Sequence, residues 1–268
     1  MTSAITALGK TFPRLKRPFW MRVYERLAGD RDPRWGFMNY GFEDPGAPRP
    51  ALDPADEPDR LSIQLYHHVV AAADLRGLAV LEVGCGRGGG ASYIARYLRP
   101  RILVGVDLSS RAAALCRARV NRATAFVCGD AQALPFGPEL FDAVINVESS
   151  HCYPDMDAFA AEVYRVLRPG GVLLYADLRF PAAAEQLRTQ LCRPGFVVRR
   201  ERDITKNVVL ALQLDASRRR AMVRRKVPVA LRGPFEAFAG VVGTRFYEKL
   251  LSGEGSYLSF VLQKPTVP

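Results

Sequence analysis

Short apolar runs alternate with stretches of helical periodicity from about residue 61 onward. Runs of strand length occupy five segments, residues 79–84, 102–108, 124–130, 140–149 and 170–178. The stretches between them repeat apolar residues at the spacing of one helix face, over residues 61–75, 89–98, 110–120 and 157–167. Strands that are apolar throughout and joined by helices are typical of a parallel sheet covered on both faces. The pattern predicts an α/β fold with a doubly wound sheet.

The carboxy-terminal part continues the pattern with a long helical interruption. A helix is predicted over 182–192, a strand over 196–204, basic helices to about residue 250 and a last strand over 256–264. Helices inserted between two late strands are expected above the sheet, where they would form a lid. The predicted divisions are an aromatic cap segment with a proline-rich loop at 1–60, a core at 61–203, a helical lid insert at 204–250 and a final core strand at 251–268.

Composition narrows the class of protein. The chain has 268 residues, of which 49% are hydrophobic and 24% charged, so it is a globular chain long enough to bury a core without disulfides. Its five cysteines include no C-x-x-C pair, which disfavours a zinc ribbon and favours the reducing cytoplasm. The sequence contains no run of 18 apolar residues, so it predicts no membrane-spanning helix. The first 24 residues lack acidic side chains, so a transit peptide remains an alternative to a cytoplasmic protein.

The net charge of +11 is concentrated near the carboxyl end. Residues 181–268 contain 16 basic and 7 acidic side chains, and six of the basic ones fall within residues 217–226. These six are Arg218, Arg219, Arg220, Arg224, Arg225 and Lys226. Two interpretations are open, a solvated helix face or a landing site for an anionic partner such as an acidic carrier protein, a membrane surface or a nucleic acid. In either case we expect all six side chains to lie outside.

A glycine-rich turn follows the first predicted strand. Gly84, Gly86 and Gly89 satisfy G-x-G-x-x-G, and the turn opens into a helix whose free amino end favours an anionic or polar ligand. Asp107 ends the next strand, 23 residues after Gly84, where a carboxylate can accept hydrogen bonds from ribose hydroxyls. Asp130 follows the third strand, where an acid can accept from an adenine amino group. This turn alone fits NAD, FAD or S-adenosylmethionine.

Five motifs together resemble the class I S-adenosylmethionine-dependent methyltransferases. They are L-E-V-G-C-G-R-G-G-G, V-D-L-S, C-G-D-A-Q-A-L-P-F, F-D-A-V-I-N and V-Y-R-V-L-R-P-G-G, in this order within residues 60–180. The resemblance implies a Rossmann-like seven-stranded sheet with an antiparallel last hairpin, S-adenosyl-L-methionine as cofactor and S-adenosyl-L-homocysteine as product. It also implies cofactor contacts by Glu82, Gly84, Cys85 and Gly86 for the methionine part, Asp107 for the ribose, and Asp130 and Ala131 for the adenine, with Leu108 and Asn146 as further cofactor-binding residues.

Two shorter motifs resemble small-molecule members near the phthiotriol O-methyltransferases. They are N-V-E-S-S-H-C-Y-P at 146–154 and N-Y-G-F at 39–42. This resemblance implies a hydrophobic lipid or polyketide hydroxyl as acceptor. Aromatic residues of the amino-terminal part would form an apolar wall over it, and the candidate acceptor-binding residues are Tyr24, Tyr40 and Tyr153.

His151 is the candidate general base. It follows the fourth strand at the carboxyl edge, where open α/β sheets bind ligands, whereas His67 and His68 lie in a helix and are interpreted as packing or surface residues. Glu148 could orient the imidazole or contact the acceptor. The alternative for His151 is a structural role, capping the next helix or stacking on Tyr153.

Other chemistries are weighed against this hypothesis. We expect Cys152 to point away from its neighbour His151 in an extended segment, which disfavours a thiol nucleophile. Asp155 and Asp157 precede a helix and are interpreted as caps rather than magnesium ligands, so we expect no metal. Nucleic-acid methylation is disfavoured because residues 146–149 read N-V-E-S rather than an N-P-P-Y clamp. C-methylation and a non-catalytic, cofactor-binding scaffold remain as alternatives.

Overall fold

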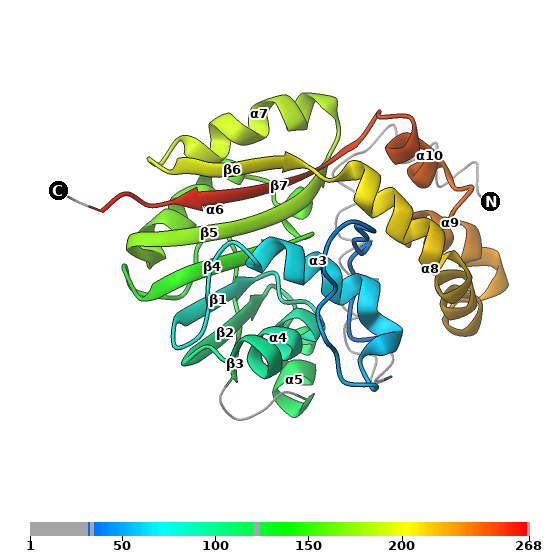
Figure 1. The fold of residues 1–268 in the computed structure, drawn as a ribbon, viewed down its shortest axis with the longest axis horizontal. Helices are drawn as coiled ribbons and strands as arrows, with labels where there is room; N and C mark the ends of the chain where they lie inside the picture. Colours follow the sequence, from blue (N-terminus) through cyan, green and yellow to red (C-terminus); the bar gives the residue numbers. More distant parts are fainter. Residues whose placement is uncertain (1–31, 33–34, 120–123, 267–268) are drawn as a thin grey trace.

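The computed structural model describes residues 32, 35–119 and 124–266, and its core is one seven-stranded sheet (Figure 1). The strands are β1 (Ala79–Val83), β2 (Ile102–Asp107), β3 (Thr124–Cys128), β4 (Phe141–Val147), β5 (Leu167–Arg179), β6 (Val197–Asp203) and β7 (Ser256–Gln263). Their order in the sheet is β3-β2-β1-β4-β5-β7-β6. Neighbours from β3 to β5 are parallel, and β7 runs antiparallel to both β5 and β6. The predicted α/β doubly wound sheet with an antiparallel last hairpin is confirmed.

Helices cover both faces of this sheet. They are α3 (Arg60–Val70), α4 (Gly89–Tyr93), α5 (Ser110–Arg119), α6 (Met156–Val166), α7 (Pro181–Cys192), α8 (Thr205–Lys226), α9 (Arg232–Phe238) and α10 (Arg245–Leu251). One core cluster contains Ile63 of α3 and Ile94 beyond α4, and the other contains Phe159 of α6 and Leu187 of α7. Two separate apolar layers explain why all five residues of β1 are buried. Within the described ranges, no helix is both long and apolar enough to cross a bilayer.

Several predicted element boundaries were wrong. Strand β5 begins at Leu167, three residues before the predicted start at residue 170, because Leu167 pairs with Phe141 of β4 and the backbones of Gly170 and Gly171 hydrogen-bond to Lys264 just after β7. The predicted basic helices up to about residue 250 are α8, α9 and α10. Pro228 follows α8 and Gly240 adopts a left-handed φ of 64° after α9, and both residues interrupt helical geometry.

Two segments lie over the carboxyl edge of the parallel strands. Helices α8, α9 and α10 connect β6 to β7 and extend beyond the sheet on the right of the view (Figure 1). Residues 35–43, which we call the strap, cross the same edge between the sheet and these helices. Tyr40 of the strap donates its backbone N–H to Glu148 at 2.8 Å, and its hydroxyl donates to the Phe238 carbonyl at 3.0 Å.

Candidate active site

The glycine turn between β1 and α4 has a tight backbone. Gly84, Gly86 and Gly88 have φ values of 77°, 51° and 80°, a left-handed conformation in which side chains are strained. A Cβ on Gly84 would lie 2.3 Å from the Ser149 hydroxyl oxygen. The turn therefore packs directly on the segment after β4, and Cys85 within it is buried.

Asp107 holds this turn from the end of β2. One carboxylate oxygen accepts the Gly86 N–H at 2.9 Å and the other accepts the Ser109 N–H at 2.9 Å. Asp107 is buried, whereas the next residue, Leu108, has 47% of its surface exposed. A fixed carboxylate beside an exposed apolar side chain suits a nucleoside, whose ribose is polar and whose base has an apolar face.

Two buried polar atoms without partners border the turn. Glu82 of β1 accepts the Tyr66 hydroxyl at 2.7 Å on one oxygen, and Asn146 of β4 donates to the Val83 carbonyl at 3.0 Å. The second Glu82 oxygen and the Asn146 carbonyl oxygen have no hydrogen-bond partner among the described residues. Burial raises the pKa of Glu82 to about 8. Unpaired buried acceptors are costly unless a ligand satisfies them, so the site fits the ammonium-bearing methionine part of S-adenosylmethionine.

The remaining predicted cofactor and acceptor residues are more scattered. Ala131 is buried, and exposed Asp130 accepts hydrogen bonds from the backbone and side chain of Gln132 at 2.9 and 3.0 Å. The Tyr153 hydroxyl lies 2.9 Å from the Ser149 hydroxyl and accepts from Asn146 at 3.2 Å. Tyr153 is thus beside the glycine turn, and Tyr24 lies outside the described residues.

His151 is paired with a carboxylate that the sequence analysis did not identify. Its Nδ1 lies 2.8 Å from Asp177 of β5, and its backbone N–H donates to the same carboxylate at 2.8 Å. Asp177 is fully buried and also accepts the Ser150 hydroxyl at 2.6 Å. Burial lowers the pKa of His151, but the Asp177 charge outweighs it and the pKa is raised well above its ordinary value. His151 and Arg179 hold the pKa of Asp177 well below its usual range.

Glu148 has a different position from the one expected. It adopts a left-handed φ of 51°, and one carboxylate oxygen accepts both the Tyr40 N–H and the Tyr257 hydroxyl at 2.8 Å. Burial raises the pKa of Glu148 to about 7, although these two hydrogen bonds oppose the rise. The carboxylate that orients the imidazole is therefore Asp177, whereas Glu148 anchors the strap.

The expectation for Cys152 rested on an extended segment, and that premise was wrong. Residues Ser150–Cys152 form a 3-10 turn, which brings the exposed Cys152 side chain near the imidazole. A hydrogen bond with Cys152 contributes to raising the pKa of His151.

The other candidate residues have structural partners. His67 Nδ1 lies 2.8 Å from the Tyr93 hydroxyl, and the His68 ring stacks on Phe42 at 4.4 Å. Asp155 caps α6 by accepting two backbone N–H groups, and Asp157 pairs with Arg193. Within residues 32, 35–119 and 124–266, no group of three or more His, Cys, Asp or Glu side chains could hold a metal ion.

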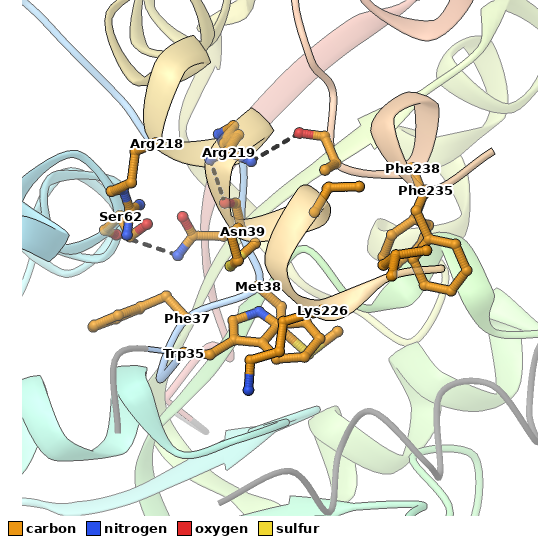
Figure 2. A pocket seen from close by; sticks show the side chains of 14 residues that line it. Trp35, Phe37, Met38, Asn39, Ser62, Arg218, Arg219, Lys226, Phe235 and Phe238 are labelled. Atoms are coloured by element: carbon orange, nitrogen blue, oxygen red, sulfur yellow. Dashed lines mark hydrogen bonds between the residues drawn. The ribbon is translucent and has the colours of Figure 1, made fainter. Parts of the chain in front are cut away.

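A pocket lies between the strap and helices α8 and α9 (Figure 2). Trp35, Phe37 and Met38 line one side, and Phe235 and Phe238 line the other. The full lining is Trp35, Phe37, Met38, Asn39, Ser62, Arg218, Arg219, Met222, Val223, Lys226, Val227, Phe235, Phe238 and Ala239. The pocket is therefore largely apolar, with cationic groups along α8.

Arg219 corrects the prediction that the six basic side chains all lie outside. Only 6% of its surface is exposed, and its guanidinium donates to the Asn39 carbonyl at 2.9 Å and the Ala239 carbonyl at 3.0 Å (Figure 2). Its Nε lies 2.9 Å from Asp215 one turn earlier on α8. The buried Arg219 guanidinium therefore connects the strap to the helices that follow β6. The sequence did not indicate this position, because Arg219 lies between two further arginines, Arg218 and Arg220.

The strap also contacts the glycine turn. Buried Arg87 stacks its guanidinium on the Trp35 ring, 4.6 Å from the centroid, and donates Nε–H to the Trp35 carbonyl. A Cβ on Gly89 would lie 2.7 Å from the Gly36 carbonyl oxygen. Trp35 of the strap therefore contacts the glycine turn and also lines the pocket, so the strap connects the two.

Comparison with known proteins agrees with this geometry. Residues 81–175 match a family described as a methyltransferase domain. The chain is 43% identical over 230 residues to a fatty-acid O-methyltransferase of Mycolicibacterium smegmatis, covering 85% of this chain and 83% of the relative. It is 40% identical over 256 residues to a phthiotriol/phenolphthiotriol dimycocerosates methyltransferase of Mycobacterium tuberculosis, covering 95% and 93%.

Solved structures agree in fold at lower identity. A putative sarcosine dimethylglycine methyltransferase from Galdieria sulphuraria has a TM-score of 0.70 at 14% identity, covering 90% of this chain and 98% of that one. A geranyl diphosphate methyltransferase in complex with SAM has a TM-score of 0.64 at 19% identity, covering 86% and 99%. One conclusion follows from the glycine turn that Asp107 supports, from the order of the strands in the sheet, and from the relatives at 43% and 40% identity over most of the chain. This chain belongs to the class I S-adenosylmethionine-dependent methyltransferases.

Proposed function

We propose that this enzyme methylates a hydroxyl oxygen of a hydrophobic lipid or polyketide, without a metal, and that His151 is its general base. The observation that carries the proposal is the 2.8 Å contact between His151 Nδ1 and buried Asp177 at the carboxyl edge of the sheet. The five cysteines, all free, favour work in the cytoplasm.

The cofactor residues are assigned by their partners. Asp107 would accept from the ribose hydroxyls, Leu108 and Ala131 would contact the adenine near Asp130, and the unpaired oxygens of Glu82 and Asn146 would accept from the methionine ammonium. When bound, S-adenosylmethionine supplies an electrophilic methyl group on a sulfonium. The protein must keep the acceptor oxygen in line with this group and exclude water.

Proton removal is the part of the reaction assigned to His151. An Nδ1–H that donates to Asp177 leaves Nε2 with the lone pair, so Nε2 can take the hydroxyl proton as the oxygen attacks. The Asp177 charge stabilises the imidazolium that forms, which is why the pKa of His151 is raised. Asp177 is therefore a positioning residue that also makes the base stronger.

The acceptor assignment rests on the pocket and on the relatives' names. Trp35, Phe37, Met38 and Phe238 provide an apolar lining, and Tyr40 positions the strap between this pocket and Glu148. Relatives at 43% and 40% identity are named for fatty acids and for phthiotriol dimycocerosates. We propose the strap as the cap and α8–α10 as the lid of this acceptor pocket.

The test compares acceptors of different acidity in the parent and in His151→Gln. With a long-chain alcohol we expect kcat to fall by about 10²–10⁴-fold, the usual contribution of a general base. With a fatty acid, which is already ionised, the loss should be much smaller. S-adenosylhomocysteine affinity should stay unchanged in calorimetry. Equal losses on both acceptors would show that His151 positions the acceptor and is not a base.

Product analysis separates the remaining alternatives. NMR of the product should show an O–CH₃ resonance, and a C–CH₃ resonance would assign C-methylation instead. If the parent protein binds the cofactor but methylates neither acceptor, the result would favour a cofactor-binding scaffold. This outcome is physically possible because the fold alone does not fix the activity: a [4+2]-cyclase, SpnF, has a TM-score of 0.66 to this chain.

A further inference from the structure

The apolar pocket has a protruding rim between α8 and α9. Val227 and Phe235 both line the pocket, so residues 228–234, which we call the lid tip, connect its two walls on the outside. Val229–Leu231 form a single 3-10 turn within the lid tip. The exposed fraction is 74% for Val229 and 42% for Leu231. Two large apolar side chains therefore face solvent next to the pocket.

Basic side chains surround the lid tip. Arg224 is exposed at the end of α8 and makes no ion pair with any residue in the described ranges. Arg232 holds the base of the lid tip by donating to the Val227 and Arg224 carbonyls at 3.2 and 2.9 Å. Arg225 is 3.0 Å from Asp32. Residues 204–250 contain ten basic and three acidic side chains, an excess of seven positive charges, and Arg225 and Lys226 share the single Asp32 carboxylate.

We infer that the lid tip docks the enzyme on an anionic lipid surface. Val229 and Leu231 would enter the head-group layer, and Arg224 would face the lipid phosphates. This combination of exposed apolar side chains and cations is the one by which peripheral segments bind a membrane interface. Docking would place the pocket rim at the bilayer, so that a lipid acceptor could enter without crossing water. This last benefit, but not the docking itself, rests on the proposed function.

A lipid surface explains the lid tip better than an acidic carrier protein does. Exposed apolar residues scattered singly are ordinary, but here Val229, Ala230 and Leu231 are consecutive and exposed on the rim of an apolar pocket. A protein partner needs a broad complementary surface of about 800 Å² on each side. A short protruding turn with a basic surround can enter a head-group layer without such a surface.

The test is sedimentation with vesicles of phosphatidylcholine containing about 30% phosphatidylglycerol, and with vesicles of phosphatidylcholine alone. We expect binding to the anionic vesicles that weakens with salt, and little binding to the neutral ones. Arg224→Gln should lower the partition coefficient about fivefold, because a cation near an anionic membrane contributes about 1 kcal/mol. The pair Val229→Ser and Leu231→Ser should lower it at least tenfold.

The matched control is the pair Arg101→Gln and Ile102→Ser. These residues are also exposed and adjacent, with Ile102 41% exposed, but they lie at the amino end of β2, opposite the lid. The control should bind vesicles like the parent. All variants should retain parent turnover on a short, water-soluble acceptor, so that failure of docking is measured separately from failure of the methyltransferase activity.

Two results would overturn the inference. The first is absence of binding to anionic vesicles, or equal losses in the lid tip and control variants. The second is a parent enzyme that binds a purified acidic acyl carrier protein but no vesicles, together with lid tip variants that no longer bind the carrier. This result would assign the lid tip to a carrier protein instead.

Discussion

Replacing Asp177 with asparagine should weaken the proposed base and move its pH dependence. Asp177 is fully buried, and His151 Nδ1 lies 2.8 Å from its carboxylate. An asparagine at this position would keep the size of the side chain and remove its charge. In the parent this charge raises the pKa of His151 against the opposing effect of burial. In Asp177→Asn the lowering effect of burial would be opposed only by the smaller contribution of Cys152, so the pKa of His151 should fall.

The size of the effect follows from this one contact. A hydrogen bond to a charged group contributes about 1.5–3 kcal/mol, and one pKa unit corresponds to about 1.4 kcal/mol. Asp177→Asn should therefore lower the pKa of His151 by about 1–2 units. Because the imidazolium formed during proton transfer loses the same support, kcat on a long-chain alcohol should fall about 10- to 150-fold at high pH.

The measurement is the pH profile of kcat/KM for the alcohol. In the parent, kcat/KM should rise as pH rises through the raised pKa of His151, because only neutral imidazole accepts a proton. In Asp177→Asn this rise should occur at lower pH, with a lower plateau. A fatty-acid acceptor, which needs no base, is the control. An unmoved rise, or an unchanged plateau, would refute the assignment of Asp177 as the group that strengthens the base.

The pH dependence of folding stability gives a second, independent test of the pairing between Asp177 and His151. The folded pKa of Asp177 is lowered, so its contribution is present above the unfolded pKa and is lost as pH falls through the folded value. The folded pKa of His151 is raised, so its contribution is present below the unfolded pKa near 6.5 and is lost as pH rises through the folded value. The difference in Tm between the parent and Asp177→Asn should be largest between about pH 4 and 6.5.

Two further substitutions test the cofactor turn and the lid. Asp107→Ala should weaken S-adenosylmethionine binding at least tenfold in calorimetry, about 1.4 kcal/mol, and lower Tm because the Gly86 N–H loses its acceptor; unchanged affinity would remove the ribose assignment. Arg219→Gln should destabilise the fold by about 1–3 kcal/mol in urea unfolding, because the buried Asn39 and Ala239 carbonyls lose their donor while Asp215 keeps its pairing with Arg218. Arg220→Gln should cost little, and equal effects would contradict the inward position of Arg219.

The chain's own pattern was enough to predict the sheet and the glycine turn after β1. Apolar runs, helical spacing and the glycine signature are local features, because each reports how a short segment meets a core or a ligand. The order of the motifs along residues 60–180 was likewise sufficient to indicate the family. The start of β5 was not predictable in this way, because Leu167 continues the apolar spacing of the preceding helix and belongs to the strand only through its pairing with Phe141 of β4.

The arrangement of the proposed catalytic side chains depended on contacts between distant parts of the chain. Asp177 reaches His151 only because β5 lies beside β4, and Glu148 holds Tyr40 from 108 positions away. Arg219 is buried, unlike the adjacent Arg218 and Arg220, because the strap and the lid offer two carbonyls to that one guanidinium. A charged side chain is buried only where partners satisfy it, and sequence periodicity does not contain the positions of those partners.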